Sequence, residues 1–149
     1  MKLSKNFKLN EFLISRTHPE LLVNIHIPPQ YKWNLFKLAV IHLQTIRDFM
    51  KVPLYITSGF RTHELNKRAG GRKLSQHLYG EAADFVILND KGVDREAMEE
   101  VPAFVKSHLW PAVGEFITYR RKDGKIRFFH ISLPDPRFIQ KFYTMKEKD

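Results

Sequence analysis

The sequence predicts an α+β fold for the whole chain. Apolar side chains recur at helical spacing through residues 32–50, as expected for a core helix. Two strand-like runs, residues 114–119 and 126–133, flank charged residues around Asp123-Gly124, a pair favoured in two-residue hairpin turns. Helices that are segregated from hairpin-linked strands favour an α+β arrangement over a parallel sheet with alternating helices.

The N-terminal half is expected to contain the core helix and one strand. An irregular segment ends at Pro28-Pro29, and the core helix follows it. The apolar positions expected on its face are Phe36, Ala39, Val40, Leu43, Ile46 and Met50. Residues 52–57 are typical of a short buried strand. A polar helix over residues 62–69 is then closed by Gly70-Gly71.

The C-terminal half is expected to supply most of the sheet. Residues 82–88 form an apolar, partly β-branched run, which places Asp84 on a strand near the middle of the sheet. Asp94 is expected to cap a helix that runs through Val101, and Pro102 to kink that helix or to begin a second one. The two hairpin strands complete the fold.

Composition limits the possible functions. The chain has 149 residues without a linker or repeat, which indicates one domain over residues 1–149, expected to be a monomer. It contains no cysteine, so disulfides, thiolate catalysis and cysteine-bound zinc are excluded. The net charge of +9 indicates attraction to polyanions, which are nucleic acid, an anionic membrane surface or anionic cell-wall polymers.

The sequence shows neither a secretory signal peptide nor a membrane span. Its first residues are basic, but a polar segment follows them in place of an apolar run. No stretch approaches the roughly 20 apolar residues that a membrane span needs. We therefore expect a protein made in the cytoplasm that would act outside it only if something other than its own leader released it.

A metal site is the strongest functional signal in the chain. His77 precedes Asp84 by seven residues, and with the distant His130 they offer ligand types that suit one zinc ion. A catalytic zinc typically has three protein ligands and keeps a fourth position for water. Asp84 would be costly to bury unpaired in an apolar strand, and a metal shared with His77 is a suitable partner. A single histidine is more often an ordinary side chain, and the other five histidines keep that interpretation.

The predicted hairpin brings one more acidic residue to the same face. A two-residue turn at Asp123-Gly124 puts Ile117 opposite His130, so that Glu115 lies diagonally across from His130. A carboxylate there is placed to act as a general base towards a metal-activated water. The alternative is an ordinary strand-edge carboxylate paired with a Lys or Arg side chain.

Arg61 follows the Ser58-Gly59 turn, where a guanidinium could clamp a substrate carboxylate or carbonyl. The alternative is a surface salt bridge, for instance to Glu64.

These residues together resemble a known family. The series Ser58-Gly59-Phe60-Arg61, Asn66, Gly70-Gly71, Ser75-Gln76-His77, Ala82-Ala83-Asp84 and Phe129-His130-Ile131-Ser132 is similar to the zinc D-alanyl-D-alanine carboxypeptidases. That group includes phage cell-wall endopeptidases and the hedgehog-like fold.

The resemblance implies a small antiparallel sheet with helices packed on one side. On this sheet His77, Asp84 and His130 would hold one zinc ion. It also implies hydrolysis of a peptide bond in the peptidoglycan stem or cross-bridge. Arg61 matches the arginine that orients the substrate, and Ser75 matches a residue that lines the same pocket.

One position departs from the family pattern. Many relatives carry an acid/base residue a few positions before the second histidine, but residues 125–129 contain no carboxylate. The role is then either moved to Glu115 or absent. Absence would indicate a noncatalytic peptidoglycan-binding domain, which is the main alternative to a peptidase. A nucleic-acid-binding protein is a third reading of the charge, but no recognised binding motif supports it.

Overall fold

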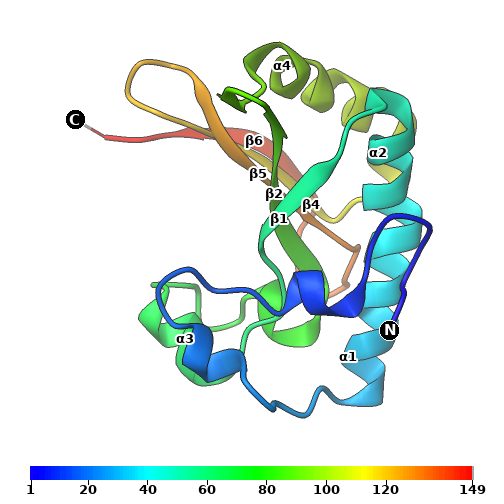
Figure 1. Ribbon diagram of the computed structural model, residues 1–149, viewed down its shortest axis with the longest axis vertical. Helices are drawn as coiled ribbons and strands as arrows, with labels where there is room; N and C mark the ends of the chain where they lie inside the picture. The colour runs from blue at the N-terminus through cyan, green and yellow to red at the C-terminus, as the bar shows by residue number, and fades with distance from the viewer. Residues whose placement is uncertain (149) are drawn as a thin grey trace.

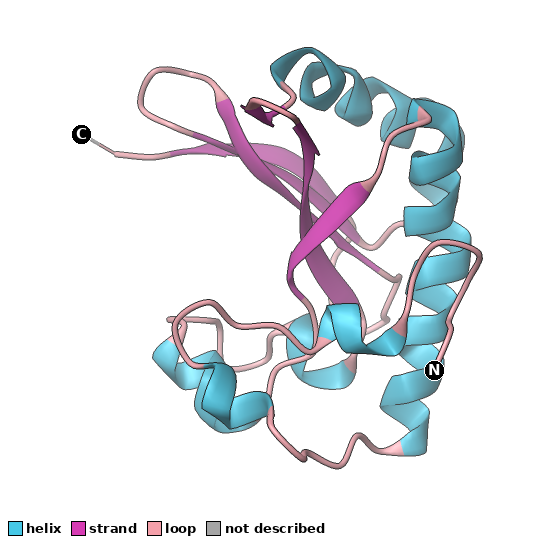
Figure 2. Ribbon diagram, viewed as in Figure 1, coloured by secondary structure: helices cyan, strands magenta, loops and turns pink. Residues whose placement is uncertain are grey.

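The computed structural model describes residues 1–148 and confirms the predicted α+β fold (Figure 1). A twisted sheet forms one layer, and the long helices cover one of its faces (Figure 2). The strands are β1 Leu54–Ser58, β2 Ala82–Asn89, β3 Gly92–Val93, β4 Glu115–Arg120, β5 Ile126–Ser132 and β6 Lys141–Lys146. Their order is β1-β2-β5-β4-β6, with β3 paired to β2. Among residues 1–148, no helix combines the length and apolarity needed to cross a membrane.

The predicted core helix is present but begins earlier and is not uniform. It comprises α1 Pro29–Lys37, a π-helical segment Leu38–Leu43 and α2 Gln44–Met50. Proline is well suited to the first helical position, because its missing N–H would have no partner there. Lys51 ends the helix in the left-handed conformation, with φ of 57°.

The face of this helix that meets the sheet differs in part from the predicted one. The predicted positions Ala39, Leu43 and Ile46 are fully buried, but Phe36 and Val40 are exposed. The core face also includes Leu35 and Leu38. Apolar side chains lie on two adjacent stripes of this helix, so periodicity alone could not decide which one packs against the sheet.

The two other predicted helices are confirmed. In α3, His63–Arg68, the Thr62 hydroxyl accepts from the backbone N–H of Leu65. Asp94 caps α4, Arg95–Phe104, as expected. Pro102 lies inside α4 without ending it, and the chain stays helical through Val105–Leu109 and Trp110–Ala112.

The β4–β5 hairpin has the predicted register, although its turn differs. Ile117 pairs with His130, as expected. The loop contains three residues rather than two, because a hydrogen bond from Arg121 N–H to Lys125 O closes it and Gly124 has φ of 87°. A one-residue bulge at Arg127 on β5 compensates for the longer loop, since Tyr119 pairs with Phe128 but Arg120 pairs with Ile126. The two deviations cancel, so the predicted side-chain faces are correct.

Strand β6 is the main departure from the predicted antiparallel sheet. It pairs in parallel with β4, where Ile117 lies beside Tyr143. Every other pairing in the sheet described for residues 1–148 is antiparallel. β6 forms one edge of the sheet and brings the C-terminal segment next to the strand that carries Glu115.

Alternation along β2 separates the core from the site. Ala83, Phe85 and Ile87 are fully buried in the apolar core. Asp84 and Val86 therefore point to the opposite face of the strand. His130 on β5 is paired with Asp84 and shares this face. The sheet thus presents apolar side chains to the helices and the candidate site residues to its other side.

Candidate metal centre

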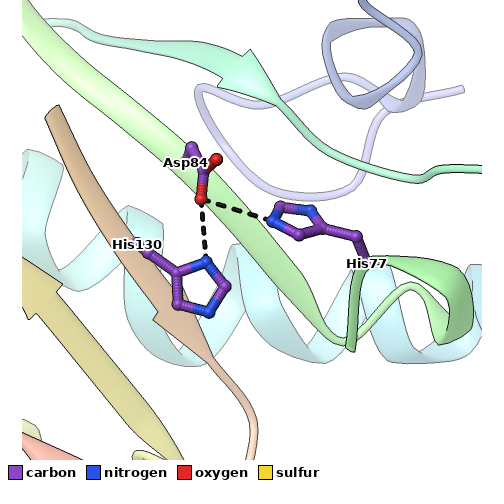
Figure 3. Close-up of side chains that lie close together, drawn as sticks. All are labelled: His77, Asp84 and His130. Carbon is purple, nitrogen blue, oxygen red and sulfur yellow. Dashed lines mark hydrogen bonds and ion pairs between the residues drawn. The ribbon is translucent and has the colours of Figure 1, made fainter. Parts of the chain in front are cut away.

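Three side chains that are far apart in the sequence converge on the sheet face away from the core. Asp84 lies directly opposite His130 in the β2–β5 pairing. His77 comes from a short 3-10 helix, Gln76–Tyr79, that precedes β2. One ligand atom from each residue lies within 4.8 Å of the other two, and all three residues are buried (Figure 3). The residues selected from the sequence therefore form a candidate metal site.

The Asp84 carboxylate lies at the centre of this group. Its Oδ1 atom is 2.8 Å from Nδ1 of His130 and 3.3 Å from Nε2 of His77. Its Oδ2 atom lies 3.9 Å from Nη2 of Arg61. Burial raises the pKa of Asp84, but the two histidines outweigh it and hold the pKa well below its usual range. The carboxylate is therefore ionised, with one oxygen facing both imidazoles.

A backbone carbonyl fixes the ring of His77. Its Nδ1–H donates to Gly59 O at 2.7 Å, which leaves Nε2 directed at Asp84. Such a hydrogen bond sets the tautomer and orientation of a metal-ligating histidine. Burial lowers the pKa of His77 and outweighs the opposing effect of Asp84. The ring is therefore neutral, which is the form that binds metal.

The carbonyl that holds His77 is itself held by the N-terminal segment. A Cβ atom on Gly59 would lie 2.4 Å from the carbonyl oxygen of Phe12, so only glycine permits this close packing. The same oxygen accepts from Phe60 N–H at 2.8 Å. Ser75 lines the site and caps the 3-10 helix, because its hydroxyl accepts from His77 N–H at 3.3 Å.

His130 lies between two carboxylates. Its Nδ1–H donates to Asp84, and its Nε2 atom lies 3.2 Å from Oε1 of Glu115. The contact with Glu115 is close in distance, but Nε2 has no well-aligned hydrogen bond. Burial lowers the pKa of His130, but the two carboxylates outweigh it and raise the pKa to about 9. In a protein without metal this ring therefore carries a proton, which a metal ion would replace.

Arg61 is held by three protein groups. Its Nε donates to Ser58 Oγ and its Nη1 donates to Asn66 Oδ1, both at 3.2 Å. Its Nη2 faces Asp84, and its side chain is only 15% exposed. The alternative of a surface salt bridge to Glu64 is wrong, because Glu64 instead pairs with Arg68, one helical turn later.

A cavity of about 300 Å³ opens beside the three candidate ligands. Besides the residues selected from the sequence, Arg72, Tyr119 and Phe128 line its wall. Burial, followed by the charge of Asp84, raises the pKa of Tyr119 to about 12. The phenol is therefore a neutral group in this wall. Tyr119 and Arg72 were not selected from the sequence, because neither belongs to the motifs that identified the site.

A second acidic cluster ties the C-terminal segment to the loop that carries His77. Arg137 Nη2 donates to Glu81 Oε1 at 3.1 Å, and its guanidinium stacks over Tyr79. Burial, followed by a hydrogen bond with Asp135, raises the pKa of Glu81 to about 7. The folded protein thus binds a proton on Glu81 that the unfolded chain releases above its ordinary pKa of 4.5.

This shift predicts how stability depends on pH. The pKa of Glu81 is raised in the folded state. Its contribution to the free energy of unfolding is therefore fully present below about pH 4.5 and is lost as the pH rises to about 7. Glu81→Gln keeps a hydrogen-bond donor for Asp135. Across this pH window we expect its free energy of unfolding to rise by on the order of 2 kcal/mol relative to wild type. Urea unfolding of both metal-free proteins from pH 4.5 to 8 measures the difference. The exposed Glu100→Gln is the control, and parallel curves for wild type and Glu81→Gln would contradict the expectation.

The donor set fits a divalent metal such as zinc. Two imidazole nitrogens and one carboxylate oxygen are the ligand types that catalytic zinc sites use. Gly59 O sets the orientation of His77, and Glu115 lies against the far nitrogen of His130. Such supporting contacts are typical of metal-ligating histidines.

Comparison with known families supports this interpretation. The family model for Peptidase M15 matches residues 5–117, which is most of the chain. The matched range ends before His130, which the structure nevertheless places beside Asp84. A search of curated proteins finds no significant match. The sequence motifs, the sheet and the family match agree, and the chain belongs to the peptidase M15 family of metallopeptidases.

Proposed function

We propose that this protein is a zinc-dependent peptidase that hydrolyses peptide bonds of peptidoglycan, in the stem peptide or the cross-bridge. The observation that carries the proposal is the convergence of His77, Asp84 and His130 beside an open cavity. Membership of a metallopeptidase family supports the reaction class. A D-Ala-D-Ala carboxypeptidase and an endopeptidase are both compatible with this site.

We propose that the three residues hold one zinc ion, through Nε2 of His77, Oδ1 of Asp84 and Nδ1 of His130. When bound, zinc supplies a Lewis acid that polarises a carbonyl and lowers the pKa of a water. Asp84 contacts both imidazoles through one oxygen, while the charge of Arg61 lies 3.9 Å from the other oxygen. Arg61 thus orients a ligand, and we propose that its remaining N–H groups orient the substrate carbonyl.

We propose Glu115 as the proton acceptor. Among residues 1–148, it is the only carboxylate besides Asp84 that lines the cavity. Burial raises the pKa of Glu115, but His130 and Arg72 outweigh it and lower the pKa, so the carboxylate is ionised at neutral pH. Its position against His130 Nε2 gives it a second role, because a carboxylate there orients the ring. Ser75, at the cavity wall, is proposed to contact the substrate.

The proposed substrate also fits the charge of the protein. A net charge of +9 favours association with anionic wall polymers, and salt weakens such association. We propose that the protein acts as a monomer on the cell wall after release from the cytoplasm, as phage lysins do. Peptidoglycan peptides are then its partners, and nucleic acid is not.

Incubation with purified peptidoglycan tests the proposal. We expect the zinc-loaded protein to contain one zinc per chain and to release D-Ala or cleaved muropeptides, which mass spectrometry identifies. Treatment with a chelator is expected to stop the release, and added zinc to restore it. A zinc-loaded protein that releases nothing would contradict peptidase activity.

One observation favours a noncatalytic wall-binding domain as the second candidate. Glu115 contacts the ring nitrogen of His130 that faces away from Asp84, and residues 125–129 provide no carboxylate. This candidate predicts binding to peptidoglycan without release of any fragment. The incubation therefore separates the two candidates, since only a peptidase changes the mass of the muropeptides.

A further inference from the structure

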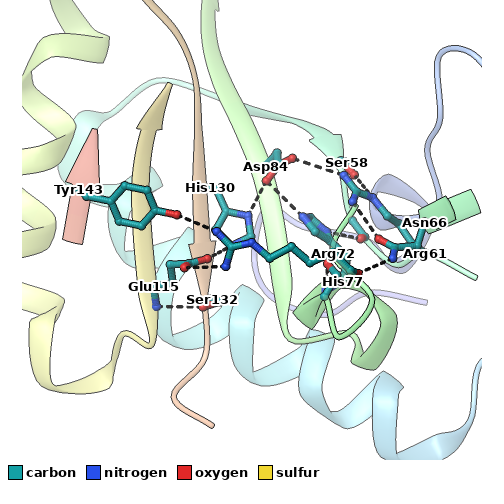
Figure 4. A network of polar contacts seen from close by, with 12 residues as sticks. Ser58, Arg61, Asn66, Arg72, His77, Asp84, Glu115, His130, Ser132 and Tyr143 are labelled. Atoms are coloured by element: carbon teal, nitrogen blue, oxygen red, sulfur yellow. Dashed lines mark hydrogen bonds and ion pairs between the residues drawn. The ribbon is translucent and has the colours of Figure 1, made fainter. Parts of the chain in front are cut away.

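Arg72 is the most exposed cationic side chain at the candidate metal centre. Its side chain is 66% exposed, against 15% for Arg61. It extends from the loop after the diglycine across the front of the site (Figure 4). Its Nη2 donates to the hydroxyl of Tyr143 on β6 at 3.1 Å, and its Nη1 lies 3.8 Å from Oε2 of Glu115.

The two arginines differ in how many donors they have free. Arg61 already uses Nε and Nη1 in hydrogen bonds, and its Nη2 faces Asp84. Arg72 makes one neutral hydrogen bond, to Tyr143, and one longer contact to a carboxylate. An arginine carries five N–H donors in a fork that matches a carboxylate. Arg72 therefore has donors to offer an anionic ligand.

The backbone of Arg72 is fixed although its side chain is exposed. Asn66 Nδ2 donates to Arg72 O at 2.8 Å, and Gly71 N–H donates to Asn66 O at 2.9 Å. A Cβ atom on Gly71 would lie 2.0 Å from Asn66 Oδ1, so any side chain here would displace the Asn66 amide that binds Arg72 O. The loop thus holds the base of the arginine while its guanidinium can change partners.

A second hollow lies on the other side of Arg72. Its lining consists of Arg72, Lys141, Phe142, Tyr143 and Met145, and it shares Arg72 and Met145 with the cavity beside the metal centre. Both charged side chains in this lining are cations. The nearest carboxylate, Glu115, is already in contact with His130. The hollow on the β6 side is therefore suited to an anionic group.

We propose that Arg72, together with Lys141, forms a subsite that binds a carboxylate of the peptide substrate on the β6 side of the metal centre. The proposal rests on the proposed peptidase function and adds a specificity determinant to it. Tyr143 holds the guanidinium in position when no substrate is bound. The carboxylate has two sources in a peptidoglycan peptide: the C-terminus of the chain or an acidic side group.

Steady-state kinetics on a soluble muropeptide tests the role of Arg72. We expect Arg72→Gln to raise KM about tenfold or more, because a hydrogen bond to a charged group is lost, and to change kcat much less. Arg68→Gln is the matched control, since it removes an exposed arginine outside the cavity lining. Arg72→Lys is expected to recover part of the loss, because it keeps the charge but not the fork. An unchanged KM in Arg72→Gln would overturn the proposal.

A purely structural role is separated by Tyr143→Phe. If Arg72 only anchors the loop to β6 through its hydrogen bond with Tyr143, then Tyr143→Phe, which removes this bond, raises KM as much as Arg72→Gln does. A carboxylate-binding Arg72 instead keeps its affinity in Tyr143→Phe, because the cation remains. Equal losses in the two variants would therefore refute the proposal. Binding of the peptide to zinc-free protein by calorimetry provides a readout that does not depend on turnover.

Two modified peptides identify the carboxylate. One peptide carries a C-terminal amide, and the other has D-Gln in place of D-Glu. We expect one of these two to bind the wild-type protein weakly, with the same affinity that the unmodified peptide has for Arg72→Gln. That peptide is then expected to show no further loss in Arg72→Gln. If both modified peptides bind like the free acid, the subsite does not recognise a carboxylate. Failure of wild type to cut any muropeptide would count against the peptidase function instead, so the two failures are distinguishable.

Discussion

Replacement of His77 by alanine is expected to abolish zinc binding and peptidase activity together. The substitution removes the Nε2 atom that faces Asp84 and leaves two of the three donors. We expect zinc affinity to fall by more than the 10–100-fold that is typical when a residue only supports a ligand. Metal analysis after dialysis and muropeptide release measure the two losses on the same sample.

The control for this experiment must separate metal loss from unfolding, because His77 is buried. Asp84→Asn keeps the shape of the side chain and removes the charge that the two histidines share, so it is expected to lose zinc as well. His63→Ala removes an exposed histidine at the start of α3 and is expected to behave like wild type. A His77→Ala protein that unfolds cooperatively and still retains one zinc per chain would show that the ion binds elsewhere.

Glu115→Gln is expected to have the second largest effect, and it distinguishes the two roles that the structure allows. If Glu115 accepts the proton of the attacking water, kcat falls by about 10²–10⁴ while zinc remains bound. If it only orients His130, zinc affinity falls by about 10–100-fold and excess zinc restores activity. We expect the first result, since Glu115 is ionised and lines the cavity.

Two measurements on this variant decide the outcome. Zinc titration of the metal-free protein gives the affinity, and kcat is measured at saturating zinc. Glu99→Gln is a suitable control, because Glu99 pairs with Arg120 at the surface, away from the cavity. Full activity of Glu115→Gln at saturating zinc would remove it as the proton acceptor.

The candidate site was predictable because a charged side chain is costly to bury in an apolar strand unless it has a partner. A carboxylate in the apolar run of β2 required a partner, and Asp84 indeed faces two histidines and an arginine. The face shared by Glu115 and His130 followed from strand alternation, which the turn error did not disturb. The alternation that relates Glu115 to His130 is visible in the sequence because it depends only on residues within one hairpin.

The features that escaped prediction depend on contacts between distant segments. β6 has a mixed sequence at the edge of the sheet, and in its parallel pairing with β4 the ring of Phe142 stacks on that of Phe116. The Arg72–Tyr143 contact joins residues 71 positions apart, and neither residue is unusual in its own segment. Which apolar stripe of the core helix is exposed could likewise not be predicted, because it depends on how the helix packs against the sheet.

The order of strands also has a consequence for how the protein is made. β5 lies between β2 and β4, so it must be inserted between two strands that precede it in the chain. Pairings over such separations form slowly, because a long loop must close first. A nascent chain that ends at β4 contains His77 and Asp84 but lacks His130. The three candidate ligands therefore cannot come together until β5, which carries His130, has been synthesised and inserted between β2 and β4.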